Sequence, residues 1–192
     1  MTTYGTRTRR WTRAEYEKLV EQGIFRAGEP IELVGGQLMV AEPQGSRHAA
    51  TVSLVADALR AAFGSGWYVM VQLPVALDDE SEPEPDVAVV RGAAREYWDA
   101  HPSRPVLVVE VADSSVALDR EYKASLYARA GVPDCWIVCV EEGIVEVYRQ
   151  PVPSPEAQYG WRYAEMQRLG RGASVAPVAS PSASILVADL LR

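Results

Sequence analysis

Two charged side chains fall on the apolar side of a predicted helix. The stretch 115–130 predicts one continuous helix, and at about 100° per residue it can be drawn as a helical wheel. The apolar arc of that wheel contains Val116, Tyr122, Leu126, Tyr127 and Ala130, and the remainder contains Arg120, Glu121, Ala124, Ser125, Ala128 and Arg129. Asp119 and Lys123 lie inside the apolar arc. A charge that faces a core is costly unless something in the interior uses it, so we expect this helix to bring charged groups to a functional site.

Two apolar segments upstream of this helix each carry one carboxylate near an end. Asp86 opens the segment 85–90, and Glu110 nearly closes the segment 106–111. If these strands pair antiparallel, the start of the first lies beside the end of the second. The two carboxylates would then face each other at one rim of the sheet, despite a separation of 24 residues (110 − 86).

Two hard oxygen ligands with open coordination positions suit Mg²⁺ or Mn²⁺, which would keep water and a substrate phosphate in its shell. Such a cation lowers the pKa of an attacking water and neutralises charge that develops on the scissile phosphate. A nearby Lys123 ammonium would orient that water or stabilise the negative charge. Asp86, Glu110 and Lys123 together therefore predict metal-dependent phosphodiester hydrolysis.

The order of elements predicts an α/β fold with a mixed sheet flanked by helices. Between residues 46 and 140 the order is helix, strand, strand, strand, helix, strand, and Ser46 is expected to cap a helix that ends at Phe63. We also expect a helix after the Thr12 capping box and a hairpin of strands 31–34 and 37–40 around Gly35-Gly36. The remaining expected strands are a bent strand at 67–77 and strands 136–140, 144–149 and 161–169. Loops are expected at 78–84, 151–158 and 173–184. We expect residues 1–192 to form a single domain with its core at about 46–149.

Composition limits the partners that the chain can have. The 192 residues are 48% hydrophobic, and no apolar run approaches the roughly 20 residues that a membrane span needs. The basic N-terminus lacks the apolar region of a signal peptide, so a cytoplasmic location is expected. The net charge of −7 argues against a protein held on nucleic acid by bulk electrostatics. This charge does not exclude a protein that contacts a phosphate only through bound metal and a local basic rim.

The two cysteines, Cys135 and Cys139, share one face of a predicted strand. At about 3.3 Å per residue they stand roughly 13 Å apart, which is too far for a disulfide. We expect two buried free thiols, as in a reducing compartment.

This arrangement resembles the PD-(D/E)XK nuclease superfamily. Pro85-Asp86 corresponds to the PD, and Glu110 corresponds to the (D/E). The chain departs from that pattern at Ala112, where the superfamily has its lysine, and Lys123 from the following helix is the substitute that could reach the same site.

More closely, the chain is similar to the Uma-two family, which is assigned to the restriction endonucleases. The similarity runs from about Thr12 to Leu191. Its motifs are the hairpin 31–38, Pro43 followed by His48, the segment 84–89, and the block 110–114 continuing through Asp119, Lys123 and 127–133 to Trp136. The resemblance implies a restriction-endonuclease-like fold and a Mg²⁺-dependent nuclease, with DNA as the expected substrate and a homodimer by analogy. Asp134-Cys135 replaces the family's usual Glu-Tyr, and Cys139 stands where Asp is common.

Each site residue also has a purely structural interpretation. Asp119 and Lys123 could form an i,i+4 ion pair worth about 0.2–0.5 kcal/mol, or Lys123 could extend its ammonium to the surface. Asp86 could be a turn residue after proline, and Glu110 a strand-terminal charge that reaches water. Taken singly, each of these structural interpretations is the plainer one, but together with the family resemblance the residues favour metal ligation by Asp86 and Glu110.

Three further residues are candidates for the surroundings of the site. His48 lies on the apolar arc of its helix, so a buried structural histidine is the plainer interpretation. Glu32 alternates with Ile31 and Leu33 and so could face water, although the resemblance makes a supporting role conceivable, as it does for Asp119. The alternative function is a catalytically inactive binding or assembly module on the same fold, which the net charge and the lack of a basic stripe favour.

Overall fold

A six-stranded mixed sheet forms the centre of the structure. The computed structural model describes residues 8–26, 28–41, 44–113 and 116–192. The sheet has the order β3-β4-β5-β6-β7-β8, in which β5 and β6 are parallel and the other neighbours are antiparallel. Its strands are β3 (Trp67–Val71), β4 (Val87–Arg91), β5 (Leu107–Ala112), β6 (Asp134–Cys139), β7 (Ile144–Pro153) and β8 (Trp161–Gly170).

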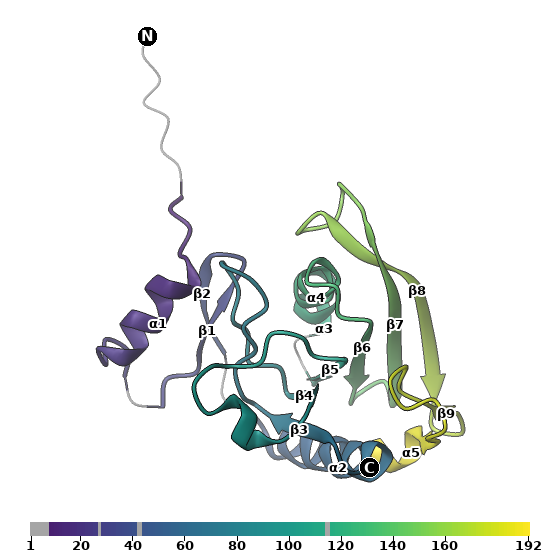
Figure 1. The fold of residues 1–192 in the computed structure, drawn as a ribbon. Helices are drawn as coiled ribbons and strands as arrows, with labels where there is room; N and C mark the ends of the chain where they lie inside the picture. The colour runs from purple at the N-terminus through teal and green to yellow at the C-terminus, as the bar shows by residue number, and fades with distance from the viewer. Residues whose placement is uncertain (1–7, 27, 42–43, 114–115) are drawn as a thin grey trace.

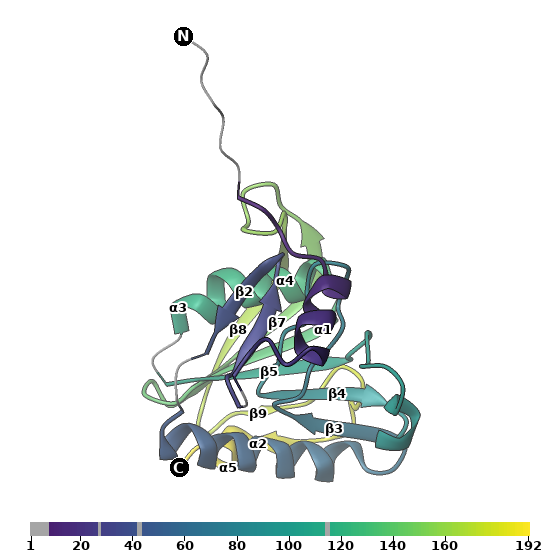
Figure 2. The same ribbon diagram turned by 90° about the vertical axis from the view of Figure 1, so that its left-hand side faces the viewer.

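Helices cover both faces of this sheet (Figures 1 and 2). One face packs against α2 (Ser46–Phe63) and the short α5 (Val187–Leu190), and the other face packs against α3 (Val116–Leu118) and α4 (Ala124–Arg129). The larger core lies on the α2 side. Its buried members include Val52, Val55, Leu59, Val87, Val89, Val109, Val111, Trp136, Val138, Val145 and Leu190.

The alternation of side chains along β5 decides which face each residue occupies. Val109 and Val111 belong to the α2 core, whereas Val108 belongs to the cluster under α4. Glu110, two positions from Val108, therefore points to the α4 side. This alternation directs the Glu110 carboxylate toward the helical segment that carries Lys123.

The N-terminal segment adds a helix and a hairpin outside the central sheet. The capping box at Thr12 and Glu15 opens α1 (Arg13–Glu21), as predicted. The hairpin β1 (Ile31–Val34) and β2 (Gln37–Val40) turns at Gly35 and Gly36, whose φ values of 55° and 79° suit glycine. Its inner strand is bridged to the loop before β4, since Leu33 and Glu82 exchange main-chain hydrogen bonds.

The predicted helix 115–130 is interrupted by a π-helical turn, and Ser115 lies outside the described residues. Asp119–Lys123 form this turn between α3 and α4. A π turn contains an extra residue, so it rotates the downstream helix relative to a regular wheel. Tyr122 is consequently exposed, while Ala124, Ser125 and Ala128 are buried, which reverses the wheel for these residues. Asp119 remains buried, as predicted.

Other boundaries also differ from the sequence prediction. Gly45, not Ser46, is the N-cap of α2, and the strand expected over 67–77 ends at Val71. Part of the expected linker 151–158 is strand, because β7 continues to Pro153. Within the expected irregular C-terminal stretch, β9 (Ser174–Val175) pairs with β10 (Ile185–Leu186). Within the described residues, no helix combines the length and apolarity needed to span a bilayer.

Candidate active site

Gln72, directly after β3, Asp86, directly before β4, and Glu110, within β5, lie in one row at the rim of the sheet. Val71 pairs with Val87 and Val87 pairs with Val109, so the next position along each strand places Gln72 opposite Asp86 and Asp86 opposite Glu110. Two hydrogen bonds support this register: the Gln72 main-chain amide donates to the Asp86 carbonyl over 3.1 Å, and the Asp86 main-chain amide donates to the side-chain Oε2 of Glu110 over 3.4 Å. The antiparallel pairing thus brings the two predicted acids together at one rim.

The Asp86 carboxylate accepts three hydrogen bonds. His48, in the first turn of α2, lies with its Nε2 2.8 Å from Oδ1, and Nε2 of Gln72 donates to the same oxygen over 3.2 Å. The main-chain amide of Val111 donates to Oδ2 over 2.8 Å. His48 is therefore neither a simple core residue nor remote from the site, because its ring holds a predicted metal ligand.

The Glu110 carboxylate is held by the helix above it. Nζ of Lys123 lies 3.3 Å from Oε1, and the Tyr127 hydroxyl donates to that same oxygen over 2.5 Å. Lys123 and Tyr127 are four residues apart, so they project from one side of the helix. The structure thus brings together all three residues that the sequence predicted as catalytic.

Glu32 is part of this cluster and does not face water. Its side chain is 10% exposed, and its Oε1 lies 3.3 Å from Nζ of Lys123. Its Oε2 accepts the main-chain amide of Glu84 over 3.0 Å. The bridge between Leu33 and Glu82 seats β1 against the loop before β4, which explains why a residue of an outlying hairpin closes the site.

The electrostatics of the cluster are dominated by negative charge. Burial raises the pKa of Glu110 to about 8, and the carboxylates of Asp119 and Asp86 add to that rise while Lys123 opposes it. Burial lowers the pKa of Lys123, but the surrounding carboxylates, Glu110 first, outweigh it and raise the pKa above its ordinary value. Burial also lowers the pKa of His48, and its hydrogen bond to Asp86 outweighs this effect and raises it.

Formal charges show what such a cluster can accept. The carboxylates of Glu32, Asp86, Glu110 and Asp119 face a single ammonium, with one imidazole beside them. Burial of all four as carboxylates would be costly without compensation, which is why the pKa of Glu110 is raised, and a divalent cation supplies two positive charges that would replace this proton. The cluster is therefore chemically suited to bind a divalent cation.

The donor atoms fit a hard cation that retains water. A carboxylate offers about four lone-pair sites, and three are used on each acid by donors from the described residues. The remaining sites are on Oδ2 of Asp86 and Oε2 of Glu110. Among the described residues, no group of three or more His, Cys, Asp or Glu side chains is arranged so that it could hold a metal ion, so the protein would supply two ligands here. Two protein oxygens completed by water match the way Mg²⁺ is usually bound.

Two of the residues that shape the site were missed by sequence reasoning. Tyr127 was assigned to the apolar arc, and only its position four residues after Lys123 could have indicated a second donor to the same acid. Gln72 carried no signal in the sequence, because its place opposite Asp86 depends on strand register and on where β3 ends.

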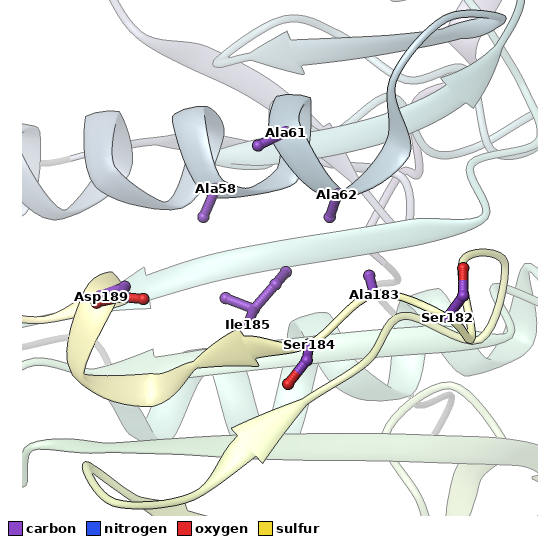
Figure 3. Close-up of a pocket in the computed structure, with 8 residues that line it drawn as sticks. All are labelled: Ala58, Ala61, Ala62, Ser182, Ala183, Ser184, Ile185 and Asp189. Carbon is purple, nitrogen blue, oxygen red and sulfur yellow. The ribbon is translucent and has the colours of Figure 1, made fainter.

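Cavities lie at both ends of α2. One, of about 440 Å³, lies between Ala58, Ala61 and Ala62 of α2 and the C-terminal segment 182–185 with Asp189 (Figure 3). None of the predicted site residues lines it. The other, of about 350 Å³, is lined by Gly45, Ser46, Arg47, Asp113 and Glu141. It adjoins the site, because Arg47 directly precedes His48.

A mixed sheet covered by helices on both faces, with an acid pair at its rim, defines the restriction-endonuclease-like class of α/β proteins, as predicted. A solved structure supports this fold: the chain is similar, with a TM-score of 0.68, to the crystal structure of a protein from Anabaena variabilis ATCC 29413, titled a "putative nuclease belonging to DUF820". The two chains are 19% identical, and the match covers 93% of this chain and 96% of the other. The chain belongs to the Uma2 family, described as "Putative restriction endonuclease", whose model matches residues 13–184. A comparison with curated proteins found no match.

Proposed function

We propose that the protein is a metal-dependent nuclease that hydrolyses phosphodiester bonds of nucleic acid, with DNA as the expected substrate. The observation that carries the proposal is the convergence of Asp86, Glu110 and Lys123, with the ammonium 3.3 Å from one acid and the two acids linked through the Asp86 amide. Membership of the Uma2 family supports the same class of activity. A cytoplasmic homodimer, built from one domain per chain, completes the proposal.

Asp86 and Glu110 would hold Mg²⁺ or Mn²⁺ through Oδ2 and Oε2, on each of which the donors from the described residues leave one acceptor site. When bound, the cation would lower the pKa of an attacking water and neutralise charge on the phosphate. The His48 ring fixes Asp86 from the opposite oxygen at 2.8 Å. Because its contact is with the acid, we assign His48 a positioning role.

Lys123 would act as a hydrogen-bond donor and not as a base. The carboxylates around it, after burial is counted, raise its pKa above the ordinary value, so its amine is charged at neutral pH. A charged ammonium can orient the attacking water and stabilise negative charge in the transition state. Glu32 shares Lys123 with Glu110 at an equal distance of 3.3 Å, and buried Asp119 adds negative charge around Lys123. We assign both acids to the support of the lysine.

The alternative function is a non-catalytic binding or assembly module on the same fold. The net charge of −7 favours it, because counterion release from a basic surface supplies most non-specific affinity for nucleic acid. The two functions share the metal site and differ in whether Lys123 meets a scissile phosphate.

Two measurements separate these functions. Calorimetric titration with Mn²⁺ should detect a site that Asp86→Asn and Glu110→Gln abolish, whereas Asp57→Asn, which changes an exposed acid of α2, should leave it intact. Incubation with plasmid, single-stranded DNA and RNA should show Mn²⁺-dependent cleavage that Lys123→Ala suppresses. Absence of a Mn²⁺ site in the wild type would overturn the proposal. Metal binding without cleavage of any substrate would favour the alternative.

A further inference from the structure

Gln72 has a backbone conformation that a side chain makes unfavourable. Its φ of 49° lies in the left-handed region, which among the described non-glycine residues is shared only by Gln150. Residues with a Cβ are uncommon there, and such strain persists only where the surrounding structure enforces it. Glycine would adopt this conformation without the steric cost, so the glutamine side chain needs an explanation.

The side chain and the main chain of Gln72 both bind Asp86. The Gln72 main-chain amide donates to the Asp86 carbonyl over 3.1 Å. The left-handed turn immediately after β3 then places the carboxamide beside the carboxylate, where Nε2 donates to Oδ1 over 3.2 Å. The second hydrogen of this amide points to Oε1 of Gln44 at 2.7 Å. The carboxamide is thus fixed from two sides although Gln72 itself is exposed.

These contacts determine which oxygen of Asp86 is free. Gln72 and His48 together fill the acceptor sites of Oδ1, and Val111 takes one of the two sites of Oδ2. If the amide of Gln72 were absent, Oδ1 would regain an open site and the carboxylate would lose one of the three donors that prevent its rotation. An acceptor site for the cation would then be available on Oδ1 as well as on Oδ2.

We propose that Gln72 is a positioning residue of the metal site, whose strained backbone holds its carboxamide on Oδ1 of Asp86 so that Oδ2 is presented to the cation. This inference rests on the proposed function, because it assigns Asp86 to a metal. It adds a residue outside the acid pair and the lysine. Residues that orient metal ligands in this way typically change metal affinity by about 10- to 100-fold when they are removed.

Gln150 provides a matched comparison within the same chain. Its φ is 59°, and it interrupts the pairing of β7 with β8 between Arg149, which pairs with Glu165, and Pro151, which pairs with Tyr163. Its Nε2 also donates to a carboxylate, Oε1 of Glu165, over 2.6 Å at an exposed position. Gln150 therefore shares the residue type, the backbone conformation and the kind of contact, but none of the site residues.

The test compares Gln72→Gly, Gln72→Met and Gln150→Gly in the full chain. Both glycine variants remove strain, so their thermal unfolding midpoints should equal or exceed that of the wild type. Gln72→Met keeps a side chain of similar size without its donor, so it should not gain stability. Calorimetric titration with Mn²⁺ should show about a 10-fold loss of affinity in both Gln72 variants and none in Gln150→Gly.

The outcomes separate this inference from the function on which it rests. A wild type that binds no Mn²⁺ would overturn the proposed function and this inference with it. A wild type that binds Mn²⁺, with either Gln72 variant matching the affinity of Gln150→Gly to within twofold, would overturn the positioning role and leave the metal site standing. If both Gln72 variants fold and lose Mn²⁺ affinity while Gln150→Gly keeps it, the positioning role of Gln72 is established.

Discussion

The Tyr127 hydroxyl donates to Oε1 of Glu110 over 2.5 Å. Both residues are buried, and Lys123 contacts the same oxygen from one helical turn earlier. The two donors occupy Oε1 and leave Oε2 facing Asp86, where the metal is proposed to bind. Tyr127 therefore stands in the same relation to Glu110 as Gln72 does to Asp86, since each donates to the oxygen that is turned away from the proposed cation.

Removing this hydroxyl should weaken metal binding without disrupting the core. Tyr127→Phe keeps the ring, so we expect about a 10-fold loss of Mn²⁺ affinity together with a loss of about 1–2 kcal/mol in the free energy of unfolding. Tyr163→Phe is the control, because Tyr163 belongs to the same buried cluster and donates to the Val132 carbonyl over 2.9 Å. Tyr163→Phe should lose stability and keep the Mn²⁺ affinity of the wild type. Equal Mn²⁺ affinities in the two variants would contradict a role for Tyr127 at the site.

The pH dependence of stability should reveal the proton on Glu110. Burial raises its pKa to about 8 from 4.5, so between these values the folded protein binds a proton that the unfolded chain does not. Its contribution to stability is therefore complete below about pH 4.5 and is lost as the pH rises through 8. The slope for one group is at most about 1.4 kcal/mol per pH unit.

Urea unfolding in the presence of a chelator checks this expectation. The free energy of unfolding of the wild type, minus that of Glu110→Gln, should fall as the pH rises from 5 to 8, because glutamine stays neutral throughout. A difference that is constant over this range would show that Glu110 is ionised in the folded protein at all of these pH values.

The positions of the acids could be predicted because they depend on local patterns. Asp86 begins one apolar strand and Glu110 lies near the end of the next, and antiparallel pairing of sequence neighbours is common enough to place them together. The same holds for the hairpin at Gly35 and for α1, where the turn and the capping box are encoded within a few residues.

The remaining parts of the site depend on tertiary contacts that no local pattern contains. Glu32 is buried only because Leu33 is bridged to Glu82, so its alternation with apolar neighbours suggested a solvent-facing residue. The π turn at Asp119–Lys123 changed the burial of the downstream helix while keeping Asp119 and Lys123 inside. A regular wheel therefore identified the right charges but misassigned Tyr122 and Ser125.

Replacement of Lys123 should make the protein depend on the metal for stability. At neutral pH, where Glu110 holds a proton, Lys123→Met leaves buried Glu32 without its ammonium, and breaking a buried ion pair by removing one partner costs about 3–5 kcal/mol. A divalent cation bound at the acids would replace part of the lost positive charge. Saturating Mn²⁺ should therefore raise the unfolding temperature of Lys123→Met by more than that of the wild type. Lys18→Met, at the only other lysine, lies in α1 on an exposed position and should behave like the wild type. An equal Mn²⁺ shift in all three proteins would contradict the expectation.

Asp134 should contribute strongly to the free energy of unfolding and should not affect the affinity for the metal. It is fully buried at the start of β6, where Oδ1 accepts Nε1 of Trp136 over 2.9 Å and Nε of Arg149 over 3.0 Å. Its Oδ2 accepts the Val178 amide over 2.8 Å, which attaches the C-terminal segment to the sheet. Asp134→Ala removes one partner of a buried ion pair and leaves these donors unsatisfied, so we expect a loss of about 3–5 kcal/mol in the free energy of unfolding.

The comparison with Asp134→Glu makes this prediction more specific. Glutamate keeps the charge but adds a methylene at a fully buried site, and overpacking typically costs about 1–3 kcal/mol. Urea unfolding should therefore rank the wild type above Asp134→Glu and Asp134→Glu above Asp134→Ala. The Mn²⁺ affinity of each folded variant should match that of the wild type, because none of the Asp134 contacts includes a residue of the site. Reduced Mn²⁺ affinity in folded Asp134→Glu would show that the packing around Trp136 is coupled to the acid pair through β5 and β6.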